Sequence, residues 1–111
     1  MAKFLFSGAY TPSGMKGLVA EGGAERVEAA KKSLESLGGQ LESFYFAMGE
    51  KDFYIIVDLP DHITATSVTM AGVMSETFSI KSVVLLTPQQ MDEAVKKHPD
   101  FRAPGETSHP K

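Results

Sequence analysis

Three side chains that can bind metal ions or move protons stand close together in the run Asp58-Leu59-Pro60-Asp61-His62. Two carboxylates and one imidazole are a conceivable ligand set for a divalent metal ion. Such a centre needs a closed site, however, and the rest of the chain supplies no further ligand at a recognisable spacing. Asp61 is better explained as the N-cap of a helix, with His62 exposed in its first turn. We therefore expect no metal ion and no other cofactor.

Asp52 and the aromatic residues near it form a second group that could bind a ligand or take part in its chemistry. A carboxylate at the mouth of an aromatic pocket can act as a base or accept a hydrogen bond from a ligand. Alternatively, Asp52 only stabilises the turn at residues 49–51 by accepting hydrogen bonds from its backbone N–H groups, and we favour this second use. No catalytic residue is assigned. The candidate ligand-binding residues are Phe6, Tyr10, Phe46, Asp52 and Tyr54.

The composition is that of one ordinary globular domain. The chain has 111 residues, of which 42% are hydrophobic and 23% are charged. It has no cysteine, which excludes disulfides, thiolate metal ligands and a cysteine nucleophile. The formal net charge of −3 argues against nucleic acid as a partner. The apolar stretch at the amino terminus is too short for a signal peptide or a membrane span, so we expect a cytoplasmic protein with no membrane partner.

Four strands and three helices are expected. The strands cover residues 4–10, 40–48, 52–59 and 79–86, and the second and third form a hairpin around Gly49. Helices are expected at residues 24–37, from residue 61, and at residues 88–97, where Thr87-Pro88-Gln89-Gln90 predicts a capping box. Thr11 and Pro12 favour one helical turn, but the four glycines between residues 14 and 23 predict a broken, loop-like segment.

This order of elements predicts an α+β fold. The sequence β-α-β-β-α-β is that of the ferredoxin-like split βαβ arrangement, with an antiparallel four-stranded sheet, and here a C-terminal helix follows it. Residues 1–98 make one domain. Residues 99–111 contain three prolines and no periodicity, and are expected to be a flexible tail.

Both faces of the expected sheet are apolar, although the two long helices can cover only one. Alternation along the strands assigns Leu5, Ser7, Ala9, Leu41, Tyr45, Ala47, Phe53, Ile55, Val57, Ile80, Val84 and Leu86 to the helix-covered face. It assigns Phe4, Phe6, Tyr10, Phe44, Phe46, Met48, Tyr54, Ile56, Val83 and Leu85 to the other. A bare face of this kind exceeds the apolar patch of a typical soluble monomer. We expect the same sheet of a second copy to cover it, in a homodimer or a larger homo-oligomer.

The hairpin region resembles the signature of the GYD-domain family. The resemblance rests on residues 44–52 with residues 53–61 after them, on Leu37-Gly38-Gly39, and on the stretch from residues 76–77 to residues 87–88. It extends over roughly residues 3–97 of the chain. Gly49 and Asp52 match the motif that gives the family its name, whereas Lys51 stands at the position of its tyrosine, so no role of that tyrosine is transferred here.

The resemblance implies a ferredoxin-like domain of the dimeric α/β-barrel type, in which two sheets pack face to face. Related barrels include cofactor-free monooxygenases, lactone isomerases, haem enzymes and ligand-sensing regulatory domains, but a shared fold does not transmit an activity. The favoured hypothesis is a homo-oligomeric barrel that binds a small apolar or aromatic molecule. The alternatives are a small enzyme resembling the cofactor-free monooxygenases or isomerases, and a purely structural or regulatory oligomerisation module.

RNA binding is a further alternative that the sequence disfavours. Residues 5–10 loosely resemble the first-strand motif of an RNA-recognition domain, and Lys51-Asp52-Phe53 begins like its third-strand motif. Tyr54 and Ile55 then depart from that motif. Phe6 and Phe53 are also expected on opposite faces of the sheet, where they cannot form one stacking platform.

Overall fold

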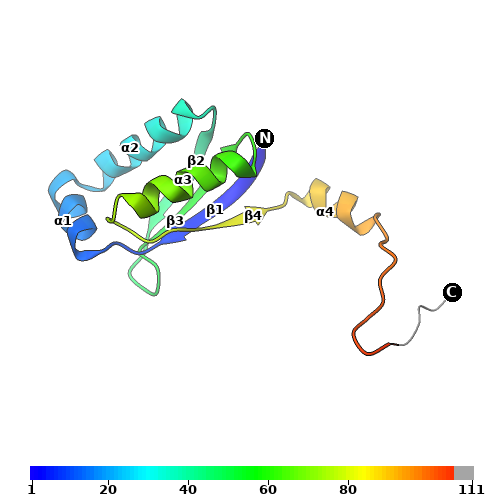
Figure 1. The fold of residues 1–111 in the computed structure, drawn as a ribbon. Helices are drawn as coiled ribbons and strands as arrows, with labels where there is room; N and C mark the ends of the chain where they lie inside the picture. The colour runs from blue at the N-terminus through cyan, green and yellow to red at the C-terminus, as the bar shows by residue number, and fades with distance from the viewer. Residues whose placement is uncertain (107–111) are drawn as a thin grey trace.

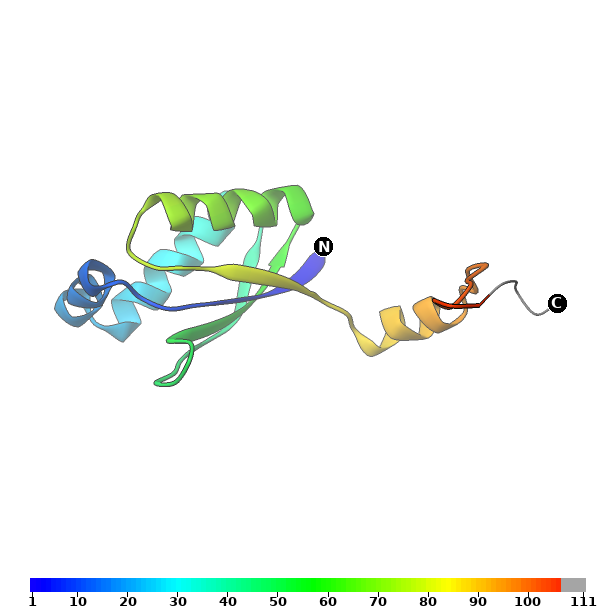
Figure 2. The same cartoon turned by 60° about the horizontal axis from the view of Figure 1, so that its bottom comes forward.

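A computed structural model describes residues 1–106 and shows an α+β fold with a layer of helices on one face of a sheet (Figure 1). The sheet has the order β2-β3-β1-β4, and all its neighbouring strands are antiparallel. Figure 2 shows α2 and α3 together above the sheet, while its other face carries no helix. The elements are β1 (Ala2–Gly8), α1 (Pro12–Glu21), α2 (Gly23–Ser36), β2 (Gln40–Phe46), β3 (Phe53–Leu59), α3 (His62–Met74), β4 (Lys81–Leu85) and α4 (Pro88–Val95).

The helix caps expected from the sequence are confirmed. Thr87 accepts a hydrogen bond from the Gln90 N–H at 3.2 Å, and the Gln90 side chain accepts one from the Thr87 N–H at 2.9 Å. The Asp61 carboxylate accepts from the Thr64 N–H at 2.8 Å and caps α3. Gly38 follows α2 with φ of 77°, the left-handed conformation that ends many helices. These signals are local, which is why the sequence predicts them well.

The loop-like segment expected at residues 14–23 is wrong, because α1 is a complete helix of ten residues. Thr11 caps it by accepting from the Gly14 N–H at 3.2 Å, and Pro12 occupies its first turn. A Cβ on Gly14 would lie 1.8 Å from the carbonyl oxygen of Thr77. Gly14 therefore permits the close approach of α1 to the chain before β4, and only Gly22, with φ of 89°, interrupts the helix.

The expected orientation of β1 is also wrong. Phe4 pairs with Val57 and Phe6 with Ile55, so both rings lie on the face that the helices cover. Phe6 is only 1% exposed and belongs to the core together with Phe4, Val57 and Leu59. The strand is apolar on both sides, so its alternation alone does not say which side faces inward. If the assignment of residues to the two faces is shifted by one position, every side chain of the strand is placed on the opposite face of the sheet.

A β-bulge reverses the expected orientation of most of β2. The pairing with β3 shifts between Leu41 and Ser43, so Glu42 is an extra residue in the strand. Leu41 keeps its expected place opposite Val57, but beyond the bulge Phe44 and Phe46 face the helices instead of Tyr45. The orientations expected for β3 and β4 agree with the pairing of these strands.

The sheet face without helices, here called the open face, remains apolar after these corrections. Tyr45, 70% exposed, pairs with Tyr54, 42% exposed, and next to them lie Leu5 and Ile56. The open face of the paired strands consists of Lys3, Leu5, Ser7, Gln40, Ser43, Tyr45, Tyr54, Ile56, Asp58, Lys81, Val83 and Leu85.

Beyond β4 the chain leaves the body of the fold. Figure 1 shows α4 and the residues after it projecting past the end of the sheet. Residues 99–106 contain no helix or strand, and the rest of the expected tail, including its histidine at position 109, lies outside the described residues. No helix within residues 1–106 has both the length and the apolar character that a membrane crossing requires.

Replacement of Gly14 should test the contact between α1 and the segment before β4. We expect Gly14→Ala to lower the free energy of unfolding by about 1–3 kcal/mol, because the new Cβ clashes with backbone atoms of Thr77. Gly17→Ala is the matched control in the same helix: its Cβ meets nothing within 4 Å, and it should stabilise the protein by about 0.5–1 kcal/mol. Urea denaturation measures both, and equal effects of the two changes would contradict the assigned role of Gly14.

Candidate functional site

A cavity of about 530 Å³ lies between α2, α3 and the sheet. Its floor comes from the sheet, its walls come from the two helices, and it reaches the surface between them, where Ser33 and Ser67 are exposed. This volume is in the range of sites for small ligands. We call it the α2–α3 cavity. Its lining is Phe6, Tyr10, Arg26, Ala29, Ala30, Ser33, Leu34, Ser36, Leu37, Phe44, Phe53, Ile55, Val57, Ser67, Val68, Ala71, Gly72, Ser75, Thr77, Phe78 and Ile80.

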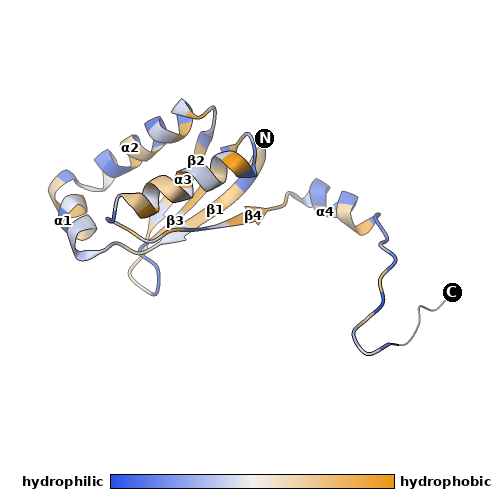
Figure 3. Cartoon of the chain, viewed as in Figure 1, coloured by the Kyte–Doolittle hydropathy of each residue, from blue (hydrophilic) through white to orange (hydrophobic). Residues whose placement is uncertain are grey.

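The cavity exists because small residues on the helices face large rings on the sheet. On α2 the inner side carries Ala29, Ala30 and Ser33, and on α3 it carries Ala71 and Gly72. Short side chains let the helices approach the sheet but do not fill the space between them. Figure 3 shows the difference between the helices: polar residues recur along α2, whereas α3 is mostly apolar. An apolar space with a few polar groups at its edge is the usual character of a small-molecule site.

Aromatic rings concentrate at one end of the cavity. The Phe53 ring lies 5.4 Å from that of Tyr10, 5.5 Å from Phe78 and 6.3 Å from Phe44, measured between centroids. Phe44 in turn lies 4.9 Å from Phe46. The planes of Phe53 and Phe78 meet at 89°, an edge-to-face contact of the kind that aromatic pairs prefer. The rings of Tyr10, Phe44, Phe53 and Phe78 thus form one connected aromatic group in the cavity lining.

Asp52 holds this end of the cavity together. Its carboxylate accepts a hydrogen bond from the Tyr10 backbone N–H at 2.8 Å, and its own N–H donates to the Gly8 carbonyl at 2.8 Å. The favoured expectation that this carboxylate binds N–H groups of its own turn is wrong, because its partner lies 42 residues away on the chain after β1. Asp52 thus fixes the position of Tyr10 and is a structural residue at the rim.

Tyr10 and Arg26 are among the polar side chains at the aromatic end of the cavity, which Ser75 and Thr77 also line. Burial raises the pKa of the Tyr10 phenol above its ordinary value of 10.0, an effect that nearby Arg26 opposes and that Glu21 and Asp52 reinforce. The hydroxyl therefore stays protonated at neutral pH and can donate a hydrogen bond. Arg26 forms an ion pair with Glu21 at 3.6 Å, so its charge is already balanced in the free protein.

The five candidate ligand-binding residues do not lie together. Phe6 and Tyr10 line the α2–α3 cavity, and Phe46 touches the aromatic cluster beside it through Phe44. Asp52 is at the rim, as described above. Tyr54 lies on the open face, on the opposite side of the sheet from the cavity.

The sequence reasoning missed most of the cavity lining. Arg26 and Phe78 line the cavity, although neither belongs to a motif that the sequence analysis identifies. On α3, Val68, Ala71 and Gly72 recur at helical spacing, and by itself this pattern predicts only a packing surface. Small residues opposite a row of Phe side chains are the one sequence signal that could have indicated a space between them.

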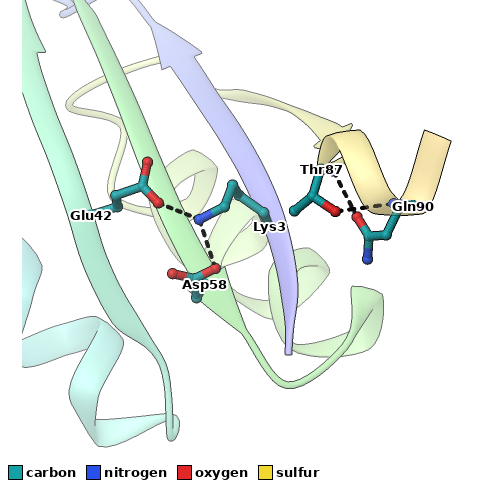
Figure 4. Close-up of polar contacts among 5 residues, drawn as sticks. All are labelled: Lys3, Glu42, Asp58, Thr87 and Gln90. Carbon is teal, nitrogen blue, oxygen red and sulfur yellow. Dashed lines mark hydrogen bonds and ion pairs between the residues drawn. The ribbon is translucent and has the colours of Figure 1, made fainter. Parts of the chain in front are cut away.

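Asp58 and Asp61, which the sequence analysis considered with His62 as metal ligands, bind different groups. Asp58 and Glu42 both bind the Lys3 ammonium group on the open face, Asp58 at 3.0 Å (Figure 4). The hydrogen bond to Glu42, followed by that to Asp58, raises the pKa of Lys3. Asp61 caps α3, which lowers the pKa of its carboxyl group through hydrogen bonds from Thr64. Within residues 1–106 no three His, Asp or Glu side chains are grouped in a way that could hold a metal ion.

The model of one protein family, the GYD domain, matches residues 4–95 of this chain. No curated protein and no solved structure matches it significantly. The matched span contains every described helix, every described strand apart from the first two residues of β1, and the whole of the α2–α3 cavity.

The raised pKa of Tyr10 predicts a pH-dependent contribution to stability. A raised pKa means that the folded protein holds the phenol proton more tightly than the unfolded chain does. This contribution is complete below pH 10.0, the ordinary tyrosine pKa, and is lost as the pH rises above it. The free energy of unfolding should therefore fall more steeply between about pH 9 and about pH 11 in the wild type than in Tyr10→Phe. Denaturation at several pH values measures this, and identical slopes would refute it.

Proposed function

This chain belongs to the GYD-domain family, and we propose that it is a homodimeric protein that binds a small, uncharged ring compound in the α2–α3 cavity. The single observation that carries the proposal is the cavity itself, about 530 Å³ of space with an aromatic floor and small side chains on its walls. Transfer of an apolar molecule from water into such a space is favourable by about 25 cal/mol for each Å² of apolar surface removed from water.

The polar groups at the cavity support an uncharged ligand. Arg26 is paired with Glu21, and Asp52 lies close by, so an anionic head group gains little net attraction at this end. A carbonyl or hydroxyl oxygen can instead accept a hydrogen bond from the protonated Tyr10 phenol. Among the described residues of the lining there is no Asp, Glu or His. The side chains present are suited to holding and orienting a molecule, and we accordingly propose binding rather than turnover.

The open face supports the proposed homodimer. Leu5, Tyr45, Tyr54, Ile56 and Val83 form an apolar surface there. The strand order β2-β3-β1-β4 with α2 and α3 on one face is compatible with the ferredoxin-like split βαβ arrangement. In the proposed dimer, two such sheets pack face to face as a dimeric α/β barrel, as sheets do in sandwich folds.

Charge on the open face favours a two-fold arrangement. At the end of the open face where β1 begins, the side chains of Lys3, Glu42 and Asp58 together carry a net charge of −1, because one cation lies beside two carboxylates. At the other end, Lys81 pairs with Ser7 and adds a positive charge. A two-fold axis that lies between the two sheets and runs perpendicular to the strands places Lys81 of each copy near the acidic end of the other. A two-fold axis parallel to the strands would bring like charges together.

Binding can be tested with N-phenyl-1-naphthylamine, an uncharged ring probe that becomes fluorescent in apolar surroundings. We expect saturable binding to the wild type. Ala30→Phe should weaken that binding at least about tenfold, because the new ring occupies the cavity that the probe needs. Ala24→Phe is the matched control, since Ala24 is exposed on the same helix and does not line the cavity.

The anionic analogue 8-anilinonaphthalene-1-sulfonate tests the charge preference. It should bind more weakly than the uncharged probe, since the ion pair of Arg26 leaves no unbalanced positive charge at the cavity. Equal probe binding by Ala30→Phe and the wild type would refute the cavity as the binding site. Tighter binding of the anionic probe would refute the uncharged class of ligand.

The homodimer can be tested with Tyr54→Glu. Tyr54 lies on a central strand of the open face and is 42% exposed, so the single chain tolerates a carboxylate there whereas a packed dimer interface does not. Sedimentation velocity should show a dimer for the wild type and a monomer for Tyr54→Glu at the same concentration. Val19→Glu introduces the same charge on α1, at a side chain that is 77% exposed, and should remain dimeric. A monomeric wild type would contradict the proposal.

A further inference from the structure

A second, smaller cavity of about 180 Å³ lies beside the α2–α3 cavity. It is formed by α1, by the first turn of α2 and by the chain before β4, and we call it the α1 cavity. Tyr10, Arg26 and Thr77 line both cavities, so the two spaces meet at these side chains.

The size of the α1 cavity suits part of a molecule. Sites that take whole small ligands begin at about 300 Å³, and the α1 cavity is smaller than that. Glycine keeps it open, because Gly17 lines it without a side chain and a Cβ at this position would meet nothing within 4 Å. The α1 cavity therefore has room for a substituent of a few atoms on a ligand whose main part lies in the α2–α3 cavity.

The Tyr10 hydroxyl, where the two cavities meet, is a hydrogen-bond donor that the protein does not use. Among residues 1–106 no group accepts a hydrogen bond from it, and the phenol is affected only by burial and by nearby charges. Its ring packs against Phe53 and Phe78 at centroid distances of 5.4 and 6.0 Å, and Asp52 holds its backbone N–H. A donor already held in place binds an acceptor with little further loss of conformational freedom.

Arg26 and Glu21 supply further donors and an acceptor at the same place. Their nearest nitrogen and oxygen atoms are 3.6 Å apart, beyond the range of a good N–H···O hydrogen bond, which ends at about 3.2 Å. The two charges balance each other, yet within the described part of the chain neither side chain makes a hydrogen bond. Glu21 lines only the α1 cavity, so a group that reaches its carboxylate has to enter that cavity.

These three side chains discriminate between polar substituents. A carboxylate accepts hydrogen bonds from Tyr10 and Arg26 but is repelled by Glu21, and an ammonium group is repelled by Arg26. A ketone only accepts, so it displaces water from Glu21 without replacing the lost hydrogen bond. A primary carboxamide matches all three, because its oxygen has two lone pairs and its NH₂ group donates.

We propose that the α1 cavity is the polar subsite of the ring-binding site and that the ligand is an aromatic carboxamide. The ring system lies on the aromatic floor of the α2–α3 cavity. The carboxamide oxygen accepts from Tyr10 and Arg26, and its NH₂ group donates to Glu21 in the α1 cavity. This inference rests on the proposed function and names the class of ligand for the same site.

The class of ligand is tested by displacement of N-phenyl-1-naphthylamine from the wild type. 2-Naphthamide and 2-acetylnaphthalene share the ring system and the carbonyl group, and differ in an NH₂ group in place of a methyl group. The amide should bind with a Kd at least about fivefold lower, because it alone donates to Glu21. 2-Naphthoate should bind more weakly than the amide, since Glu21 repels its charge.

The subsite is located with Gly17→Leu, because Gly17 lines the α1 cavity alone and the new side chain grows into open space. The Kd of 2-naphthamide should rise at least about tenfold, and that of N-phenyl-1-naphthylamine much less. Ala20→Leu is the matched control, since Ala20 is exposed on the same helix and lines neither cavity. Both Kd values should stay within about twofold of the wild type in this control.

Glu21→Leu tests the acceptor and should remove the preference for 2-naphthamide over 2-acetylnaphthalene, a ratio that a general loosening of the fold does not change. Equal Kd values of these two compounds in the wild type, or equal effects of Gly17→Leu and Ala20→Leu on the amide, would overturn the inference. In both cases intact binding of N-phenyl-1-naphthylamine would leave the proposed function standing. A wild type that binds neither this probe nor the naphthalene compounds would refute both.

Discussion

The arrangement of this protein depends on the burial of a sheet that is apolar on both faces. The central strands β1 and β3 send Phe4, Phe6, Val57 and Leu59 to one side, where α2 and α3 cover them. On the other side the same strands present Leu5 and Ile56, and no helix of the chain covers that side. Apolar surface of this extent is removed from water wherever a cover exists. The proposed contact between copies, sheet against sheet, meets this physical requirement.

On the covered face, a mismatch of side-chain size produces the α2–α3 cavity. Phenylalanine rings stand on the sheet, while alanines, serines and a glycine face them from the helices. Backbone contacts keep the rim of this space in position: Asp52 holds Tyr10, and Gly14 lets α1 approach Thr77 closely. The chain therefore keeps open a volume that ordinary close packing would fill. In the proposed function, this volume is where a ring compound lies.

The sequence predicted the elements more accurately than it predicted their faces. Caps at Asp61 and Thr87 and the left-handed glycine Gly38 act over a few residues, so their sequence signals are complete in themselves. The glycines of α1 misled the prediction, because Gly14 serves a contact with Thr77, 63 positions away, which no local pattern reveals. Likewise the Glu42 bulge is visible only once β2 is paired with β3. Of the candidate site residues, Phe6 and Tyr10 line the cavity, whereas Tyr54 lies on the other side of the sheet.

By itself, the sequence determined the α+β class, the order of the strands and of the helices other than α1, the capping contacts and the family resemblance, because each of these depends on residues near one another in the chain. Only the tertiary structure decided which rings face the helices, where the cavity lies and that α4 projects past the end of the sheet. Those features depend on strand register, and register is a relation between segments that are distant in sequence. On a strand that is apolar on both sides, a shift of one residue leaves the inward-facing positions just as apolar, but it moves every side chain to the opposite face of the sheet.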